Sequence, residues 1–375
     1  MKQKFYDITN LLKQKAQYNL LLGERSNGKS YQCKYMPLWE AYHGCDYLAF
    51  RETGKMIPKK RSQLGYLRRW REEIKKNDII AYFADAPIEA ITNGEYSGVT
   101  VYQQDIFLTR IDEKTGLEIR GKKIGRAFCL TGETHYKSLA FPEIGNVIFE
   151  EFITKSGYLP KEVDTLTSLI STIARRDEIR VLMVGNTLSR LCPYFDEWQL
   201  VNVKKQKQGT IDIYRCMTSQ YNDDGSPIIV NIAVEYCENS GSNSKMFFGN
   251  NSKMITSGVW ESDVFPHLQG RLSEYECHYQ ILYKYSSFAF VVTLLVDEER
   301  KPFLYVMPDT KTERKRPKRI VSQEFTTDKY TTLYLTNLTK YDTLVLELLE
   351  QKKVVFSDNL TGTEFYQIKK ERGRF

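Results

Sequence analysis

The sequence lacks the paired cysteines and clustered histidines that build structural metal sites and disulfide frameworks. Its seven cysteines are scattered singly, with no C-x-x-C pair and an odd total, and its four histidines are equally dispersed. Zinc sites hold their ligands at short, regular spacings, and a disulfide framework uses an even set of cysteines. We therefore expect neither feature, and we expect a protein that works in a reducing compartment.

A long hydrophobic run is also missing. The longest, FAFVVTLLV at 288–296, is about half of what a membrane-spanning helix requires. The first ten residues, MKQKFYDITN, contain no apolar segment of the kind that a signal peptide needs. We expect a soluble protein with no membrane partner.

Positive charge is present in excess. The 375 residues, enough for two domains, include 54 Lys and Arg against 47 Asp and Glu, a net charge of +7. The excess gathers in four basic runs: KKR at 59–61, RRWR at 68–71, KKQK at 204–207 and KTERKRPKR at 311–319. Any single run fits a solvated loop equally well. Together they favour a polyanionic partner, because each Lys or Arg beside a phosphate releases a counterion.

The stretch from Gly23 to Ser30 matches a phosphate-binding loop. Tyr18–Leu22 is an apolar run of strand length, and the residues after it fit G-x-x-x-x-G-K-[ST]. In such a loop, backbone N–H groups close around the β-phosphate, the lysine reaches the β and γ oxygens, and the serine ligates Mg²⁺. The helix-compatible segment that follows, YQCKYMPLWEAY, would direct its N-terminus at the phosphates. With ATP and Mg²⁺ as cofactors, the predicted loop residues are Gly23, Glu24, Arg25, Ser26, Asn27, Gly28, Lys29 and Ser30.

A second apolar run, NVIFEEF at 146–152, ends in two glutamates. In the P-loop ATPases that hydrolyse with their own base, the first acid of such a strand holds the Mg²⁺ shell and the second orients the attacking water. The first acid is usually Asp; here it is Glu150, whose extra methylene favours contact through water. Glu151 is the expected base. The alternative is an edge strand with a solvated acidic end.

Two further polar features follow. The strand-like run IRVLMVGNT (179–187) makes Asn186 a candidate sensor of the γ-phosphate, or else a cap of the next turn. Residues 160–178 predict a helix with Leu166, Leu169, Ile170 and Ile173 on one face. This helix ends in Arg175 and Arg176, which either answer its C-terminal dipole or, as in ring ATPases, supply a finger to a neighbouring subunit's nucleotide.

In this order the motifs resemble the phi-29-like DNA packaging ATPases. The segments that carry the resemblance are GERSNGKSY, YKSLAF, NVIFEEFI, STIARRDEIRVLMVGN and CPYF at 192–195. It covers about the first 200 residues well and the remainder loosely. It implies a homomeric ring, a pentamer, that translocates double-stranded DNA into a procapsid in the host cell cytoplasm.

The resemblance also assigns individual residues. Arg25 matches an arginine inside the glycine loop, and Lys137, in YKS, matches a lysine implicated in contacts between subunits. Arg175 or Arg176 matches the trans-acting finger; the spacing is one residue shorter, so the two remain alternatives. FRET at 50–53, which we expect to end a second strand, resembles the segment that follows that strand in these motors, with Arg51 basic in both. The predicted catalytic set is therefore Glu151, Arg175, Arg176, Lys137 and Arg25, with Asn186 binding nucleotide and Ser30 and Glu150 binding metal.

For the fold, we expect an α/β protein in two domains. Residues 1–200 form a P-loop ATPase domain of the ASCE type with a central, mostly parallel sheet and an inserted strand-rich region at about 77–130. Residues 201–254, which include NDDGSP and ENSGSNS, read as a linker or lid. Residues 255–375 form a smaller α+β domain, which the resemblance identifies as RNase H-like. This domain would dock on the procapsid portal or on an RNA attached to it.

The second domain is expected to be nuclease-dead. Residues 285–307 predict a long hairpin with its turn at Asp297–Lys301, taken as the first hairpin of the domain. A nuclease of this type holds two metals on carboxylates of its first strand, whereas residues 286–296 contain no acid.

Two alternative functions stay open. One is a terminase that both pumps and cuts, which requires an acidic metal cluster in the second domain. The other is a P-loop scaffold that binds nucleotide without hydrolysing it. The presence of Glu151, the expected base, argues against this alternative.

Overall fold

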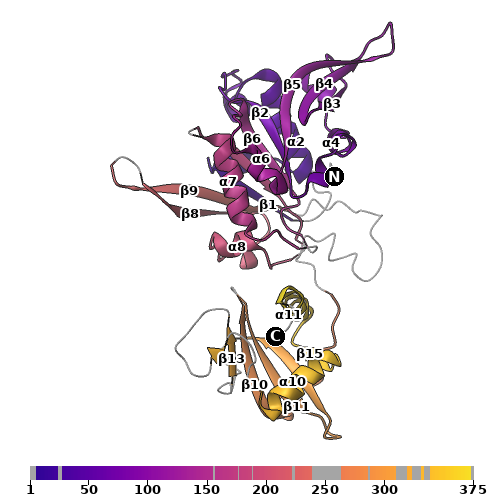
Figure 1. Cartoon of the computed structure of the whole chain (residues 1–375), viewed down its shortest axis with the longest axis vertical. Coiled ribbons are helices and arrows are strands. Elements are labelled where there is room, and N and C mark those ends of the chain that lie inside the picture. Colours follow the sequence, from indigo (N-terminus) through magenta and orange to yellow (C-terminus); the bar gives the residue numbers. More distant parts are fainter. Residues whose placement is uncertain are drawn as a thin grey trace. The chain divides into compact units, whose positions relative to one another are not determined.

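The computed structural model describes residues 6–23, 28–154, 157–175, 177–187, 189–221, 224–238, 263–285, 288–309, 319–322, 331–332 and 338–372. The chain divides into two compact units (Figure 1). The larger comprises Met1–Leu188 and Cys192–Val259, and the smaller comprises Ser189–Leu191 and Trp260–Phe375.

A nine-stranded mixed sheet forms the centre of the larger unit. Its strands, in chain order, are β1 (Tyr18–Leu22), β2 (Gln63–Arg68), β3 (Gly98–Tyr102), β4 (Asp105–Ile111), β5 (Glu118–Cys129), β6 (Ile144–Glu150), β7 (Arg180–Val184), β8 (Thr210–Tyr221) and β9 (Pro227–Tyr236). Their spatial order is β3-β4-β5-β2-β6-β7-β1-β9-β8. The neighbours from β5 to β9 pair in parallel, and β3, β4 and β8 pair antiparallel at the two edges. The predicted α/β fold is confirmed at this level.

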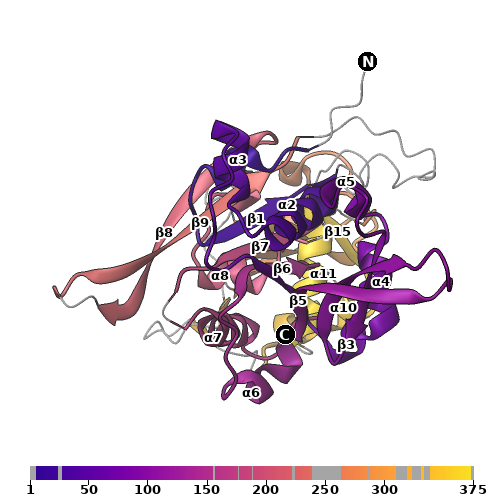
Figure 2. The same ribbon diagram turned by 90° about the horizontal axis from the view of Figure 1, so that it is seen from above.

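Helices cover both faces of this sheet. They are α1 (Thr9–Leu12), α2 (Lys29–His43), α3 (Tyr47–Thr53), α4 (Lys76–Phe83), α5 (Ile88–Ile91), α6 (Glu133–Tyr136), α7 (Glu162–Ala174) and α8 (Pro193–Glu197). Figure 2 shows α2 and α7 on opposite sides of the central strands. Coverage on both faces explains why β1 and β6 are buried along their whole length and read as continuous apolar runs.

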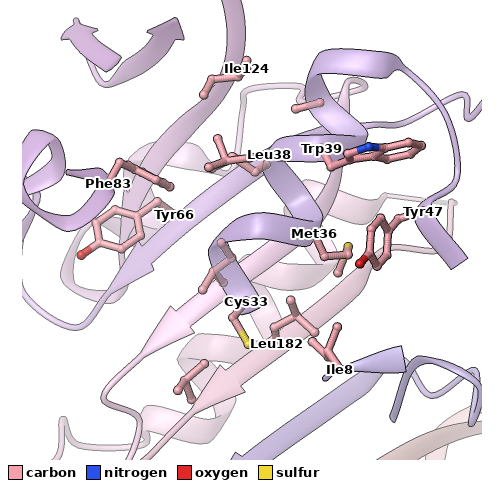
Figure 3. Close-up of a cluster of buried hydrophobic side chains, with 14 of the residues drawn as sticks. Ile8, Cys33, Met36, Leu38, Trp39, Tyr47, Tyr66, Phe83, Ile124 and Leu182 are labelled. Atoms are coloured by element: carbon pink, nitrogen blue, oxygen red, sulfur yellow. The ribbon is translucent and has the colours of Figure 1, made fainter. Parts of the chain in front are cut away.

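The face under α2 holds one continuous apolar core. Cys33, Met36 and Trp39 of α2 lie over Leu182 of β7 and Tyr66 of β2 (Figure 3). On the opposite face, α7 buries Leu166, Leu169, Ile170 and Ile173, the four positions predicted from helical spacing. The expected strands at 18–22 and 146–150 and the helix after Gly28 are confirmed as well.

Two local expectations differ from the structure. The FRET segment ends helix α3 rather than a strand: Asp46 caps the helix by accepting a hydrogen bond from Ala49 N, and Gly54 ends it in the left-handed conformation. Residues 210–236, expected in a linker or lid, form β8 and β9 of the main sheet, because β9 pairs in parallel with β1. The strand-rich region at 77–130 forms α4, α5 and the β3-β4-β5 edge.

The smaller unit has its own six-stranded sheet in the order β14-β13-β10-β11-β12-β15. The strands are β10 (Glu276–Tyr285), β11 (Phe288–Val296), β12 (Pro302–Pro308), β13 (Arg319–Ser322), β14 (Thr331–Thr332) and β15 (Val354–Phe356). Helices α10 (Lys340–Glu350) and α11 (Asn359–Arg372) pack on one face, where Val345, Leu348 and Phe365 join the core.

The predicted hairpin is present as β11 and β12, and its turn closes with a hydrogen bond from Asp297 N to Lys301 O. It is not the first hairpin of the unit, however. The preceding strand β10 pairs antiparallel with β11 and parallel with β13, which the sequence interpretation missed.

Candidate functional site

The glycine loop lies where β1 meets α2. Gly23, directly after β1, has φ 142°, and Gly28, the N-cap of α2, has φ 93°. Both values lie in the region that favours glycine, which is why this strand-to-helix turn needs glycine at its two ends. Helix α2 begins at Lys29, so its N-terminus, the positive end of the helix dipole, lies at this turn. Glu24, Arg25, Ser26 and Asn27 lie outside the described residues.

Next to the loop is a buried carboxylate at the end of β6. Glu150 is 7% exposed. Ser30 donates from Oγ to its Oε2 at 3.4 Å, and Tyr82 donates from its hydroxyl to Oε1 at 2.8 Å. Burial raises the pKa of Glu150, although the hydrogen bonds from Tyr82 and Ser30 and the charge of Lys34 act in the opposite direction. A buried carboxylate beside a hydroxyl supplies the oxygen ligands that Mg²⁺ prefers, so these residues fit the predicted metal.

Glu151 follows Glu150 but faces solvent. Its φ is 56°, and its side chain is 63% exposed. Arg68, at the end of β2, donates from Nη2 to Glu151 Oε2 at 2.8 Å and also pairs with Glu73. Arg69 donates from Nη1 to the Glu151 carbonyl at 3.2 Å. The expected base is therefore held by an arginine of the neighbouring strand.

Asn186 lies at the same edge of the sheet. The segment after β7 is tied to β1 and the loop by hydrogen bonds from Gly185 N to Leu21 O at 3.0 Å and from Thr187 N to Gly23 O at 3.3 Å. Asn186, between these two residues, is half-buried. The structure thus brings together Gly23, Gly28, Lys29, Ser30, Glu150, Glu151 and Asn186 at the carboxyl ends of β1, β6 and β7.

Arg175 lies elsewhere. Helix α7 begins at Glu162, near the end of β6, and runs back along the sheet for about 20 Å. Arg175 follows its last residue and donates from Nη2 to the Leu139 carbonyl at 2.8 Å. Lys137, after α6, is exposed and pairs with Glu133 at 3.2 Å. Neither joins the cluster around Lys29, and Arg176 lies outside the described residues.

Sequence reasoning missed several residues that build this edge. Arg69 makes a bidentate pair with the fully buried Glu162, with both contacts at 2.8 Å. Tyr194, from CPYF, donates to Glu162 Oε1 at 2.7 Å. Arg68 and Arg69 belong to the basic run RRWR, so the signal was present. It was interpreted only as charge for a polyanion, because a run of arginines does not show that acids from another strand pair with it.

Across the described ranges, no group of three or more His, Cys, Asp or Glu side chains is placed to hold a metal ion. Strand β10, which the structure describes in full, contains one acidic residue. It is Glu276, the first residue of the strand, and its side chain is 78% exposed. None of the helices that the structure describes is long and apolar enough to cross a membrane.

The fold and the site together define an α/β protein with a strand–turn–helix site, at the carboxyl edge of a parallel sheet, that suits an anionic ligand. The chain belongs to the podovirus DNA encapsidation protein (Gp16) family, whose profile matches residues 1–217. The family predicted from the sequence is confirmed.

Comparison with individual relatives supports this family assignment. The chain is 32% identical over 189 residues to the DNA packaging protein of Bacillus phage B103, covering 49% of this chain and 48% of that protein. It is 28% identical over 209 residues to the DNA packaging protein of Bacillus phage phi29, covering 53% and 52%. The matches thus span about half the length of these relatives. A structure of the bacteriophage Phi-29 viral genome packaging motor assembly shares the fold, with a TM-score of 0.52 and 20% identity over 98% of this chain and 99% of that one.

Proposed function

We propose that this protein is an ATP hydrolase that drives double-stranded DNA into a phage procapsid. The observation that carries the proposal is the convergence of the glycine loop, Lys29, Ser30 and the Glu150–Glu151 pair at one edge of a parallel sheet. Ligands bind at the carboxyl ends of such strands. Family membership and the names of the phage relatives supply the substrate.

Each residue of the edge has a distinct task in this proposal. Lys29 and the N–H groups at the start of α2 bind the β- and γ-phosphates, and Ser30 and Glu150 hold Mg²⁺. Bound Mg²⁺ would neutralise charge on the phosphates and keep Glu150 ionised. Glu151 accepts a proton from the attacking water, for which its carboxylate must leave Arg68 and turn toward the nucleotide. Asn186, next to Gly23, contacts the γ-phosphate.

The topologies support the finer fold assignments. One strand, β7, lies between β1 and β6, the order expected for the ASCE branch of P-loop ATPases. In the smaller unit, β10, β11 and β12 form an antiparallel meander, and β13 and β14 continue it in parallel from β10. This is the arrangement expected of an RNase H-like domain, here with β15 added beside β12.

The position of Arg175 supports a ring. An arginine about 20 Å along α7 from its own glutamate pair is poorly placed for its own nucleotide, but it could reach one bound by a neighbouring copy. We therefore propose a homomeric ring, a pentamer by family likeness, with Arg175 or Arg176 as a finger in trans and with Lys137 and Arg25 assisting. The ring would work in the host cytoplasm, docked on the procapsid portal directly or through an RNA.

The test is ATP turnover measured with and without procapsids and DNA. We expect turnover that rises when both are present and is lost in Lys29→Ala. Binding of ATP without phosphate release under any of these conditions would favour the non-hydrolysing scaffold. Metal-dependent cutting of DNA would favour the terminase with an active nuclease.

A further inference from the structure

Arg61, in the basic run 59–61, is buried beside the turn that carries Arg175. The residue is 5% exposed. It donates from Nη1 to the Ala174 carbonyl at 2.7 Å and from Nη2 to the Ile173 carbonyl at 2.6 Å. These are the last two residues of α7, where helix carbonyls lack intrahelical partners. Arg61 therefore occupies the acceptors that fix how the chain leaves the helix.

The same guanidinium holds the segment that leads from α6 into β6. Its Nη2 donates to the Phe141 carbonyl at 2.6 Å, and its Nε donates to the Ile144 carbonyl at 2.8 Å. Arg175 in turn donates to the Leu139 carbonyl at 2.8 Å. One buried side chain thus joins the end of α7 to the segment that follows Lys137.

Arg61 is itself held on both sides. Its neighbour Lys59 pairs with Glu40, a fully buried acid of α2, the helix that begins at Lys29. Behind Arg61, a Cβ placed at Gly145 would lie 1.9 Å from the Arg61 carbonyl, so only glycine permits this approach of the two backbones. Asp177, two residues after Arg175, accepts from Arg61 Nη1 at 3.2 Å.

These contacts do not suit a residue that grips DNA. An arginine that binds phosphate needs its donors exposed, whereas Nε, Nη1 and Nη2 of Arg61 each donate at least one hydrogen bond within the subunit. The basic run at 59–61 therefore has a use inside the subunit that its composition does not reveal.

We propose that Arg61 is a positioning residue for the trans-acting face of the subunit. It fixes the turn after α7, and with it Arg175, so that the finger reaches the nucleotide bound by a neighbouring copy. The proposal rests on the proposed function, because it assumes a ring in which the finger acts in trans.

The experiment is complementation in mixed rings. Arg61→Ala should bind a fluorescent ATP analogue within about threefold of the wild type, yet lose turnover by about the factor that the finger variant loses, roughly a thousandfold or more. Mixed with Glu151→Gln, it should regain turnover, since an intact glutamate on one subunit meets an intact finger on the other. Mixed with the finger variant Arg175→Ala or Arg176→Ala, it should regain none, because both partners lack the same half of the site.

Lys60→Ala is the matched control. Lys60 is adjacent to Arg61, its side chain is 83% exposed, and it contacts Asp177 at 3.4 Å; turnover in its rings should stay near the wild-type level. A merely structural role predicts that Arg61→Ala subunits fail with every partner. If Arg61→Ala binds ATP but is not rescued by Glu151→Gln, while a finger variant is rescued, the proposal is overturned.

Two other results are informative. If neither finger variant is rescued by Glu151→Gln, although mixed assembly is confirmed, the trans finger itself fails and the positioning role fails with it.

If Arg61→Ala melts more than about 10 °C below the wild type, the experiment is made with Arg61→Lys instead. That variant keeps the charge but cannot serve both helix carbonyls with the same geometry. The same rescue pattern is expected for it, and full turnover in its own rings would overturn the proposal.

Discussion

At Glu151 the carboxylate is exposed, but Arg68 holds it at 2.8 Å. Its neighbour Glu150 is buried against Ser30 and Tyr82. Two adjacent acids therefore have opposite environments, as expected when one ligates a metal and the other must move to take a proton. The difference arises from the strand: β6 ends at Glu150, and Glu151 leaves it with a left-handed φ.

This contrast predicts how two substitutions differ. Glu151→Gln should bind ATP nearly normally and lose turnover by several orders of magnitude, because binding needs no base. Lys29→Ala should lose binding as well, since its ammonium contacts the phosphates. Binding of a fluorescent analogue and phosphate release measure the two steps. Turnover of Glu151→Gln above a tenth of the wild-type rate would place the base elsewhere.

Glu235, on β9 beside β1, makes the larger unit sensitive to pH. Burial raises the pKa of Glu235 from about 4.5 to about 7; the carboxylates of Asp7 and Glu238 add to this effect, and a 2.6 Å hydrogen bond from Tyr6 opposes it. Between pH 4.5 and 7 the folded chain binds more protons than the unfolded chain. The free energy of unfolding therefore falls as pH rises through this window and stays lower above it.

Glu235→Gln removes the ionisation but keeps an acceptor for Tyr6. At pH 8 it should raise the free energy of unfolding by up to about 3 kcal/mol, and at pH 4.5 it should change it little. Thermal melts at pH 4.5, 6, 7 and 8 measure this, with Glu118→Gln, an exposed acid at the start of β5, as the control. An equal gain at every pH would show that the effect is not due to ionisation.

At the scale of elements, α7 is fastened at both ends. Its first residue, Glu162, is fully buried and accepts from Arg69, Tyr194 and the Leu159 amide. Its last carbonyls accept from Arg61. Because both ends of α7 are held, the turn that follows the helix has a fixed position relative to the sheet.

Breaking the first attachment should be costly. Glu162→Gln leaves Arg69 with a buried, uncompensated charge and should lower the free energy of unfolding by about 3–5 kcal/mol. Asp164→Asn, an exposed acid in the same first turn, controls for the helix dipole and should cost less than about 1 kcal/mol. Urea unfolding of both variants decides; similar losses would show that Glu162 acts only through the dipole.

The strands show what the sequence could and could not predict. Runs such as YNLLL and NVIFE can be recognised as strands from the sequence, because both faces of each strand are buried and the run is therefore largely apolar. By contrast, β9 reads PIIVNIAVEY between polar segments and was assigned to a linker, since its pairing with β1 is a contact across more than 200 residues of chain. The same holds for Arg61 and Glu162: the partners of a buried charge are set by tertiary structure, whereas the glycine loop is a local pattern.

The missed strand β10 changes the argument about cutting, but not the expected result. As the first strand of the meander, lying between β11 and β13, it takes the place assigned to β11, and its one acid, Glu276, is exposed at its start. With Mg²⁺ or Mn²⁺ and excess protein, plasmid DNA should therefore stay intact, as judged by gel electrophoresis. Linearisation that is lost in Glu276→Gln or Asp297→Asn would restore the nuclease reading.

At the scale of the whole molecule, the net charge of +7 overstates the positive charge that is available to contact DNA. In the run 59–61, Lys59 pairs with Glu40, the exposed Lys60 contacts Asp177, and Arg61 donates to helix carbonyls. In the run 68–71, Arg68 and Arg69 pair with glutamates. In the run 204–207, Lys205 and Lys207 are exposed. These two lysines, like the exposed Arg71, are therefore better candidates for phosphate contacts than the buried arginines among the described parts of the four runs.

This assignment predicts how DNA binding depends on salt. Because phosphate contacts carry no sequence information, binding should be independent of sequence, and the logarithm of its affinity should fall linearly with the logarithm of salt concentration, with a slope of about −0.9 per neutralised phosphate. Replacing Lys205 and Lys207 by Gln should make that slope shallower by about two units.

The matched pair Lys13→Gln and Lys15→Gln removes the same charge from two other exposed lysines and should leave the slope nearly unchanged. Fluorescence anisotropy with a labelled duplex at salt concentrations from about 50 to 200 mM measures both. An equal change in the two double variants would mean that net charge alone matters, and a preference for one short duplex that survives high salt would point to recognition of bases instead of backbone.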